Sequence, residues 1–374
     1  MLRRLTTLGL SVLVLASKAM PLRIPFYSTG TLRRSFICTP FSIAIITATI
    51  AYVPCRAKAT SAATALIELE LTWQPSLSAY TTGFSLEGSQ FRGVVDTGSP
   101  FLTVKKSCNR VWNNAQGDFN FGCWNGEGED DPLLGDTVEM YGSREGGVKW
   151  RRGDLSFSNN TGTFFPRVAF GIIDSTLTSP SQGGAVFFGL VKRIADGIRP
   201  SLLSEIDSSA FLLDFKSGKL ILYPPGSAPT PPEKPIKFVD LRKYGSPVQH
   251  YAARVKSLLL DGELVRLDKP TYAILDTGCS GLLLSESMYA RGIVSRTPRS
   301  AVVEFKNGLE LIGGGRKANS SFLALPFQVP WFGDRGIQRP ETQPIHVMSL
   351  GLAFFNSSAL TVDTDRMVGW VEKI

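Results

Sequence analysis

The chain has 374 residues, 43% of them hydrophobic and 19% charged, so it is too apolar for an intrinsically disordered protein and can bury one large core or two ordinary ones. Its formal net charge is +8, but residues 1–67 hold eight basic residues and no acidic one, which leaves 32 of the 40 basic residues against 32 acidic ones in the rest. The body of the chain is therefore neutral overall, and we expect no nucleic-acid partner.

The acid-free start of the chain has the composition of a targeting leader with two apolar stretches. Leu5–Ala16 follows Met-Leu-Arg-Arg and precedes small residues, so we assign residues 1–22 to a signal-type leader. Phe41–Val53 follows a twin arginine and precedes an Ala-x-Ala pattern, so we assign residues 23–60 to a second targeting segment. Both stretches are short for a membrane-spanning helix, and we expect no stable membrane insertion of the mature chain.

The two stretches together resemble a multipart plastid presequence that ends in a thylakoid-lumen signal, which predicts a plastid location. The alternative is one secretory signal followed by a pro-segment, which predicts a secreted protein or one of the endomembrane or vacuolar lumen. If cleavage follows Ala59, fewer than about ten residues precede the first strand-like text. We therefore expect control by the pH of the compartment and not by removal of an inhibitory pro-segment.

Cysteine use fits an oxidising destination. Cys38 and Cys55 fall in the leader, which leaves Cys108, Cys123 and Cys279 in the body. Cys108 and Cys123 bracket a loop rich in Asn, Gly and Asp, and a disulfide there would stabilise the fold by roughly 3 kcal/mol. The alternative is two free thiols. The sequence has no CxxC motif or His cluster, so we expect no metal and no cofactor.

The body reads as β-strands throughout. Short runs of Val, Ile, Leu, Phe and Tyr alternate with Gly, Asn, Asp and Ser, and long helical periodicity is almost absent. Six prolines in Tyr223–Pro235 predict a stiff, extended connector. We therefore predict an all-β chain with an N-terminal lobe over residues 66–223, a linker over 224–235 and a C-terminal lobe over 236–374.

The two predicted lobes repeat the same landmarks in the same order. Each has an apolar run that ends in Asp-Thr-Gly, then a short apolar run that ends in Gly, then a strand pair around an Asp. In the first lobe these are Asp96-Thr97-Gly98, Phe187–Gly189 and Asp214, and in the second they are Asp276-Thr277-Gly278, Ser349–Gly351 and Asp363. The match predicts duplicated lobes related by a pseudo-twofold axis.

The repeated tripeptide predicts a chemistry. A carboxylate at the end of a buried strand, followed by Thr and by Gly in a tight turn, is held rigidly by the backbone. A twofold axis would bring Asp96 and Asp276 face to face, where both cannot easily ionise. The pair would share one proton, so that one carboxylate activates a water and the other polarises a carbonyl group. This arrangement suits peptide hydrolysis.

On these motifs the chain resembles the pepsin-like aspartic proteases, from about Leu66 to Ile374. The resemblance implies a bilobal acid-protease fold, with a cleft between two β-barrel-like lobes, and an endopeptidase that works best at acidic pH. It implies Asp96 and Asp276 as the catalytic pair. The residues that it implies as support for the active-site loops are Thr97, Gly98, Ser99, Thr277, Gly278 and Cys279. It further implies an extended peptide or unfolded protein as substrate, no cofactor, and a monomer.

The family also has a β-hairpin flap that closes over the substrate and carries a Tyr followed by Gly, which the resemblance places at Tyr141 and Gly142. The alternative for Tyr141 is a packing role between the two strands of a hairpin. Family members often have a disulfide at the place of Cys108, and this adds to the expectation of a bridge to Cys123.

Four residues depart from the family pattern, and one of them is Pro100, which replaces a small polar residue after the first motif. Cys279 replaces a Thr or Ser hydroxyl beside the second Asp, and a thiol is a weaker hydrogen-bond donor. Thr103 replaces a Trp that braces the flap, and Glu145 replaces a small flap residue. These departures leave two alternatives open: a catalytically weakened peptide-binding or inhibitory protein on the same fold, and a structural β-protein in which the Asp residues only cap turns.

Overall fold

The computed structural model has an all-β fold, as the sequence predicts. It describes residues 65–106, 121–126, 129–130, 135–141, 144–157, 162–173, 186–194, 199–294, 298–314, 324–327, 342–355 and 358–373. The contacts divide the chain into the units Met1–Ala59 and Thr60–Ile374, and every described residue belongs to the second unit. The predicted leader, residues 1–60, therefore lies outside the described residues. Among those that are described, no helix is long and apolar enough to cross a membrane.

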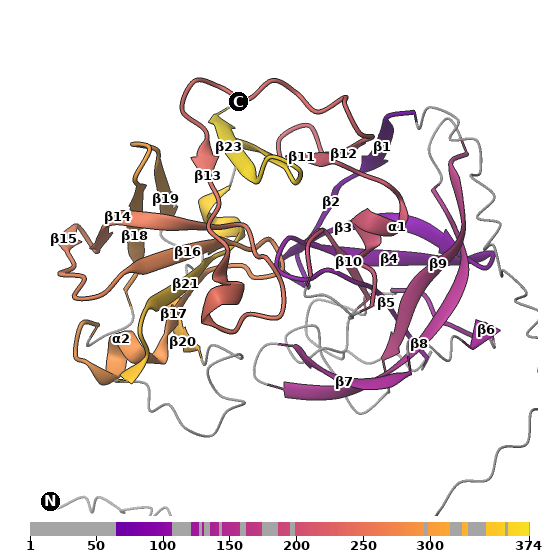
Figure 1. The fold of residues 1–374 in the computed structure, drawn as a ribbon, viewed down its shortest axis with the longest axis horizontal. Helices are drawn as coiled ribbons and strands as arrows, with labels where there is room; N and C mark the ends of the chain where they lie inside the picture. The colour runs from indigo at the N-terminus through magenta and orange to yellow at the C-terminus, as the bar shows by residue number, and fades with distance from the viewer. Residues whose placement is uncertain are drawn as a thin grey trace, which may run out of the picture. The chain divides into compact units, whose positions relative to one another are not determined.

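The strands form three sheets (Figure 1). The six-stranded sheet has the order β1 (Ile67–Glu70), β12 (Lys219–Tyr223), β11 (Ala210–Asp214), β22 (Ser358–Asp363), β23 (Val368–Lys373) and β13 (Ile236–Lys237). The nine-stranded sheet has the order β2 (Thr72–Gln74), β3 (Ala79–Leu86), β4 (Ser89–Asp96), β10 (Phe187–Gly189), β5 (Leu102–Lys105), β9 (Phe164–Ile173), β8 (Arg144–Ser156) and β6 (Glu129–Asp130), with β7 (Asp136–Tyr141) on β8.

The eight-stranded sheet belongs to the second half of the chain. Its order is β19 (Glu310–Gly314), β18 (Ser300–Phe305), β14 (Ala252–Leu260), β16 (Thr271–Leu275), β21 (His346–Leu350), β17 (Leu282–Ser285) and β20 (Ala324–Phe327), with β15 (Glu263–Leu264) on β14. The helices described are short: α1 (Leu202–Glu205), η2 (Leu241–Tyr244), α2 (Glu286–Ala290) and η4 (Leu352–Phe354). Residues 224–235, between β12 and β13, form neither helix nor strand.

The nine-stranded and eight-stranded sheets place their central strands in matching surroundings. In one, β4 pairs in parallel with β10, and β10 pairs antiparallel with β5. In the other, β16 pairs in parallel with β21, and β21 pairs antiparallel with β17. Because parallel neighbours end at the same edge of a sheet, β4 ends beside β10, and β16 ends beside β21. The loops that follow β4 and β16 therefore begin beside the ends of these neighbours.

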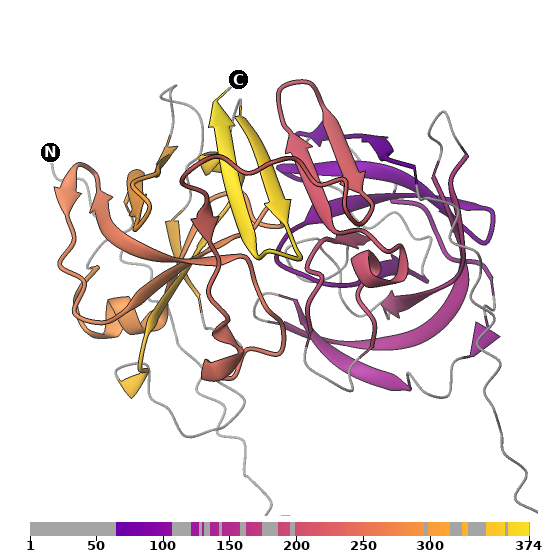
Figure 2. The ribbon, with the colours of Figure 1, turned by 45° about the horizontal axis from the view of Figure 1, so that its top comes forward.

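The six-stranded sheet joins the two halves of the chain. The hairpin β11–β12 lies beside the hairpin β22–β23, as Figure 2 shows, with β11 and β22 paired from Ala210 opposite Asp363 to Asp214 opposite Ala359. Asp214 and Asp363 have the same local role. Oδ1 of each accepts the amides two and three residues later, at 3.0 and 2.9 Å for Asp214 and at 3.1 and 2.8 Å for Asp363.

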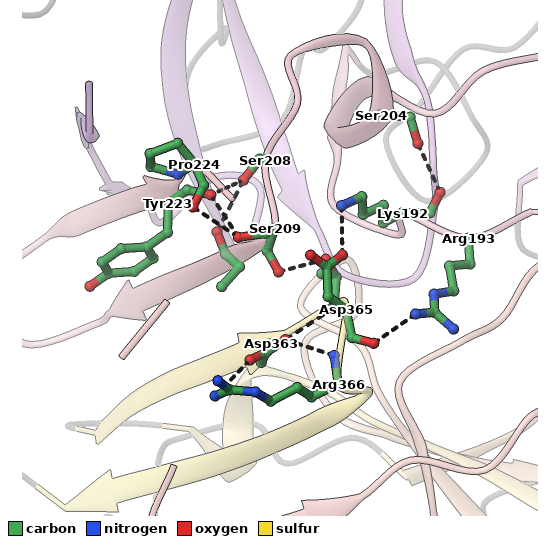
Figure 3. Close-up of polar contacts among 12 residues, drawn as sticks. Lys192, Arg193, Ser204, Ser208, Ser209, Tyr223, Pro224, Asp363, Asp365 and Arg366 are labelled. Atoms are coloured by element: carbon green, nitrogen blue, oxygen red, sulfur yellow. Dashed lines mark hydrogen bonds and ion pairs between the residues drawn. The ribbon is translucent and has the colours of Figure 1, made fainter. Parts of the chain in front are cut away.

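The turn between β22 and β23 is tied to the first half of the chain by polar contacts (Figure 3). Nζ of Lys192 lies 2.8 Å from Oδ1 of Asp365, and Nη2 of Arg193 donates to the main-chain oxygen of Asp365 at 2.7 Å. The buried hydroxyl of Thr364 donates to the main-chain oxygen of Ser209 at 2.7 Å. A single apolar cluster also runs through all three sheets, with Phe188, Leu213, Leu360 and Leu284 among its members.

Candidate functional site

The two Asp-Thr-Gly motifs lie at the ends of the two central strands. Asp96 is the last residue of β4, and Asp276 directly follows β16, all of whose residues are buried. Val95 and Leu275, the residues just before the two carboxyls, are 1% and 0% exposed. The apolar runs noted in the sequence are therefore buried strands, and burial fixes the position at which each carboxyl leaves the sheet.

The two loops are locked together by their threonines. The amide of Thr97 donates to Oγ1 of Thr277 at 3.1 Å, and the amide of Thr277 donates to Oγ1 of Thr97 at 2.9 Å. Each hydroxyl also donates to the other half of the chain, Thr97 to the main-chain oxygen of Leu275 and Thr277 to that of Val95, both at 2.7 Å. Both side chains are essentially inaccessible to solvent, so these four hydrogen bonds are protected from competition with water.

The glycines allow the two carboxyls to face each other. The amides of Gly98 and Gly278 donate to Oδ1 of their own Asp residues at 2.7 and 2.9 Å. A β-carbon added to Gly98 would lie 2.7 Å from Oδ1 of Asp276, and one added to Gly278 would lie 2.4 Å from Oδ1 of Asp96. Any other residue would collide with the opposite carboxyl. The sequence-predicted residues Asp96, Thr97, Gly98, Asp276, Thr277 and Gly278 thus meet in one place.

The carboxyl of Asp96 is strongly perturbed. Its residue is 8% exposed, and burial together with repulsion from the Asp276 carboxylate raises the pKa of Asp96 to about 7. The nearby hydroxyl of Ser99, which lies outside hydrogen-bonding geometry, and the amide of Gly98 oppose this shift only in part. Asp96 therefore holds a proton below neutral pH, as one member of a pair that shares a proton must.

Asp276 is more exposed and has a different set of donors. Its Oδ2 accepts a hydrogen bond from the hydroxyl of Ser349 at 2.8 Å, in addition to the Gly278 amide at Oδ1. Ser349 was not among the residues that the sequence singled out for chemistry. The signal was its hydroxyl in the otherwise apolar short run before Gly351, at the place that Phe187 occupies in the first half.

Cys279 is a free cysteine beside this carboxyl. Its Sγ lies 3.4 Å from the main-chain oxygen of Asp276 and 3.4 Å from Oγ of Ser349. Burial, and then the charge of Asp276, raises the pKa of the Cys279 thiol well above its ordinary value. The thiol therefore stays protonated and is a poor nucleophile at neutral pH.

The hairpin expected after the first motif is formed by β7 and β8. Tyr141 is the last residue of β7 and pairs with Arg144, and Glu145 pairs with Met140. The side chains of Tyr141 and Glu145 lie outside what the structure describes, as does Gly142. The position of Tyr141 beside the turn is thus established for its backbone alone.

Trp150 braces this hairpin from β8. Its Nε1 donates to Oγ1 of Thr137 on β7 at 2.7 Å, its ring packs edge-on against Phe101, and the guanidinium of Arg199 lies 4.6 Å from its ring centroid. Trp150 and Thr103 lie in one row, each opposite Gly171 of β9. From the sequence we noted that position 103 lacks a Trp, but we did not predict that Trp150 of β8 would lie in the same row.

Two further sequence predictions concern cysteine and metals. Cys123 is disulfide-bonded, while its expected partner Cys108 lies outside the described residues, so the pairing stays a prediction. No group of three or more His, Cys, Asp or Glu residues is placed to hold a metal within the part of the chain that the structure describes.

A second set of chemically capable side chains lies on the eight-stranded sheet. Nδ1 of His346 lies 2.8 Å from Oγ of Ser287, and Nε2 lies 2.8 Å from Oδ1 of Asp268. Ser287 and His346 are both 0% exposed, so no substrate can reach the hydroxyl. This series of hydrogen bonds satisfies buried polar groups and does not compete with the carboxyl pair as a site.

No protein-family model matches the chain, and no curated protein matches it. What the site can do must therefore be inferred from its own groups: two facing carboxyls, one of which holds a proton near neutral pH, in loops that fix each other.

Proposed function

We propose that this chain is an aspartic-type endopeptidase with the bilobal fold of the pepsin-like proteases. The observation that carries the proposal is the reciprocal hydrogen bonding of Thr97 and Thr277, which holds Asp96 and Asp276 face to face across two glycines. A turn-capping role does not account for it, because capping needs a carboxylate and local amides but no second loop from the other half of the chain.

In the proposed reaction Asp276 is the base and Asp96 the acid, since burial favours the protonated form of Asp96. Asp276 takes a proton from a water whose oxygen bonds to the peptide carbonyl carbon, and Asp96 gives its proton to the carbonyl oxygen. The C–N bond of the resulting diol then breaks, as Asp276 protonates the nitrogen and one diol hydroxyl returns a proton to Asp96. The pair ends with one proton, as it began.

We further propose an extended peptide or unfolded protein as the substrate, held under the hairpin β7–β8 with Tyr141 at its tip. The position of the hairpin in the sheet supports this, because β8 pairs with β9 and β9 with β5, whose N-terminal end follows the Asp96 loop. The shared-proton state favours an acidic compartment, and the plastid, with its thylakoid lumen, stays our proposed location.

The test is cleavage of an unfolded protein substrate between pH 3 and 8 by the chain from Thr60 onward. Asp96→Asn and Asp276→Asn should each lower kcat/KM at least about 10³-fold, because each removes a proton-transfer group. Asp214→Asn is the matched control, since Asp214 also accepts two turn amides but lies on the six-stranded sheet, and it should keep full activity.

Three outcomes are informative. Acid-favoured cleavage that is lost in both Asp variants and blocked by a pepstatin-type inhibitor supports the endopeptidase. A folded wild-type chain that binds the inhibitor but cuts nothing at any pH supports the alternative, a weakened peptide-binding or inhibitory protein, which Cys279 beside the pair favours. Cleavage that survives both substitutions rejects the carboxyl pair as the catalytic group.

A further inference from the structure

We propose that Ser349 is a positioning residue of the carboxyl pair: its hydroxyl, supplied from β21 beneath the loop, keeps Asp276 in the ionised form and so makes it the base. The inference rests on the proposed function and assigns a role to a residue outside both Asp-Thr-Gly motifs. It departs from the sequence expectation, which placed the supporting group of the second carboxyl on the loop itself, at position 279.

The first support is the unequal hydrogen bonding of the two carboxyls. Each Asp accepts the amide of the glycine two residues later. Asp276 alone accepts a second hydrogen bond within normal distance, from Ser349 to Oδ2 at 2.8 Å, whereas the Ser99 hydroxyl near Asp96 lies outside hydrogen-bonding geometry. Since a donor to a carboxylate stabilises its charged form, the shared proton is directed away from Asp276 and toward Asp96.

The second support is the break in the internal symmetry at this residue. Ser349 pairs with Ile274, two residues before Asp276, and Phe187 pairs with Val94, two residues before Asp96. Equivalent positions on the two short strands thus carry a hydroxyl in one half and an apolar ring in the other. Ser349 is 3% exposed, and burial of its hydroxyl costs free energy unless the hydroxyl is hydrogen-bonded, as it is here to Asp276.

The third support is the neighbouring Cys279. Its thiol is within 3.4 Å of Oγ of Ser349, but the hydroxyl is the stronger donor and the nearer one to Oδ2. A hydroxyl has one proton, and because that proton is given to Asp276, Oγ of Ser349 can only accept from the thiol, whose own single proton can go to Ser349 or to the main-chain oxygen of Asp276. Cys279 therefore does not take the place of Ser349 as the donor to Oδ2 of Asp276.

The titratable groups that face Asp276, among the described residues, are Asp96 at the end of β4 and Cys279 on its own loop. β21 contributes the neutral Ser349, and its His346 is engaged with Ser287 and Asp268. The Cys279 thiol stays protonated. When the Ser349 hydroxyl is removed, Asp96 is therefore the one charged or titrating group of this set that determines the protonation of Asp276.

The test is the pH profile of kcat/KM for Ser349→Ala. Without the hydroxyl, the pair gains its second proton more easily, so the acidic limb should move to higher pH by about one unit and kcat/KM at the optimum should fall about tenfold. Ser358→Ala is the matched control, because Ser358 is also a buried serine of the second half with a hydrogen-bonded hydroxyl, and its profile should not move.

Two further comparisons separate this role from packing. Ser349→Thr and Ser349→Val have nearly the same volume and differ in the hydroxyl, so the Thr variant should keep the acidic limb of the wild type and the Val variant should shift it. Adding Cys279→Ser to Ser349→Ala places a hydroxyl beside the same carboxyl and should move the limb back. Equal profiles for the Thr and Val variants would overturn the proposal.

A readout that needs no activity keeps this inference distinct from the proposed function. With the aspartate carboxyl carbons labelled with ¹³C, the signal lost in Asp276→Asn identifies Asp276, and its titration midpoint can be followed by NMR. The midpoint should be higher in Ser349→Ala than in the wild type, even if neither protein cleaves peptides. An unchanged midpoint rejects the role of Ser349, while absent cleavage with a shifted midpoint rejects only the endopeptidase.

Discussion

At the scale of the residue, the carboxyl of Asp96 lies where its ionised form lowers the stability of the fold. The carboxyl is buried and faces a second carboxylate, so its ionisation in the folded state is disfavoured relative to the unfolded chain. A group whose pKa is higher in the folded chain than in the unfolded chain stabilises the fold fully below its unfolded-state pKa, which is near 4 for Asp. It loses this stabilisation as the pH rises through its folded-state pKa. The wild-type chain should therefore lose stability as the pH rises from about 4 through the folded-state pKa of Asp96, about 7.

Asp96→Asn removes this loss, because the amide resembles the protonated carboxyl and does not titrate. The melting temperature of the variant should exceed that of the wild type by at least about 3 °C at pH 8, with the difference shrinking toward pH 4. Asp214→Asn should behave in the opposite way: although burial opposes it, hydrogen bonds from Ser217 and Lys216 lower the pKa of Asp214, so its stabilisation is present at neutral pH and lost in acid. The measurement is the melting temperature across this pH range. If the difference in melting temperature between the wild type and Asp96→Asn does not change with pH, the raised pKa of Asp96 is rejected.

At the scale of the element, the hairpin β7–β8 depends on one indole. Trp150 is 1% exposed and contacts both Phe101 and Arg199, and its Nε1 donates to Thr137. A neutral hydrogen bond of this kind contributes about 1 kcal/mol. Because the two residues belong to opposite strands, the bond resists separation of the hairpin near its base.

Trp150→Phe and Thr137→Val each remove one partner of this bond, so the two changes should not be additive. The double variant should be more stable than the sum of the single losses predicts by about 1 kcal/mol, measured by urea unfolding. Faster hydrogen exchange of the β7 amides should accompany either change. Trp73→Phe, at a residue 44% exposed, is the control and should alter stability by less than about 0.5 kcal/mol. Strict additivity would mean that the bond does not brace the hairpin.

At the scale of the whole molecule, the two halves meet in the six-stranded sheet and at the turn of β22–β23. The ion pair of Lys192 and Asp365 is half-exposed at the carboxylate, whereas the Thr364 hydroxyl that reaches Ser209 is fully buried. Surface ion pairs contribute little because water and salt screen them, and buried hydrogen bonds are not screened in this way. The buried contact should therefore contribute more to joining the halves than the visible charge pair.

Thr364→Val should lower the free energy of unfolding by about 1 kcal/mol at any ionic strength, since it removes a buried hydrogen bond. Asp365→Asn should cost less than about 1 kcal/mol in dilute buffer and almost nothing in 1 M salt. Guanidinium is itself a salt, so the comparison requires urea. A salt-insensitive loss in Asp365→Asn larger than that in Thr364→Val would reverse this ranking.

The sequence could predict those parts of the site that local patterns encode. Asp96 and Asp276 follow buried apolar runs, and Thr and Gly after each Asp specify a tight loop, so both loops and the all-β class could be read without coordinates. Ser349 could not, because it meets Asp276 only through the parallel pairing of β16 and β21, 73 residues along the chain. Trp150 reaches the row of Thr103 through two strand pairings, and pairing register has no local signal.

The reciprocal hydrogen bonds of Thr97 and Thr277 can form only late in the synthesis of the chain, because they need both of its halves. A nascent chain that has emerged only as far as β12 holds one carboxyl loop, and the amide and hydroxyl of Thr97 have no partner from the second half. The last strands, β22 and β23, then join the sheet that spans both halves. The carboxyl pair is therefore assembled only when translation is nearly finished, so that an activity of the kind we propose would be absent for most of the synthesis of the chain.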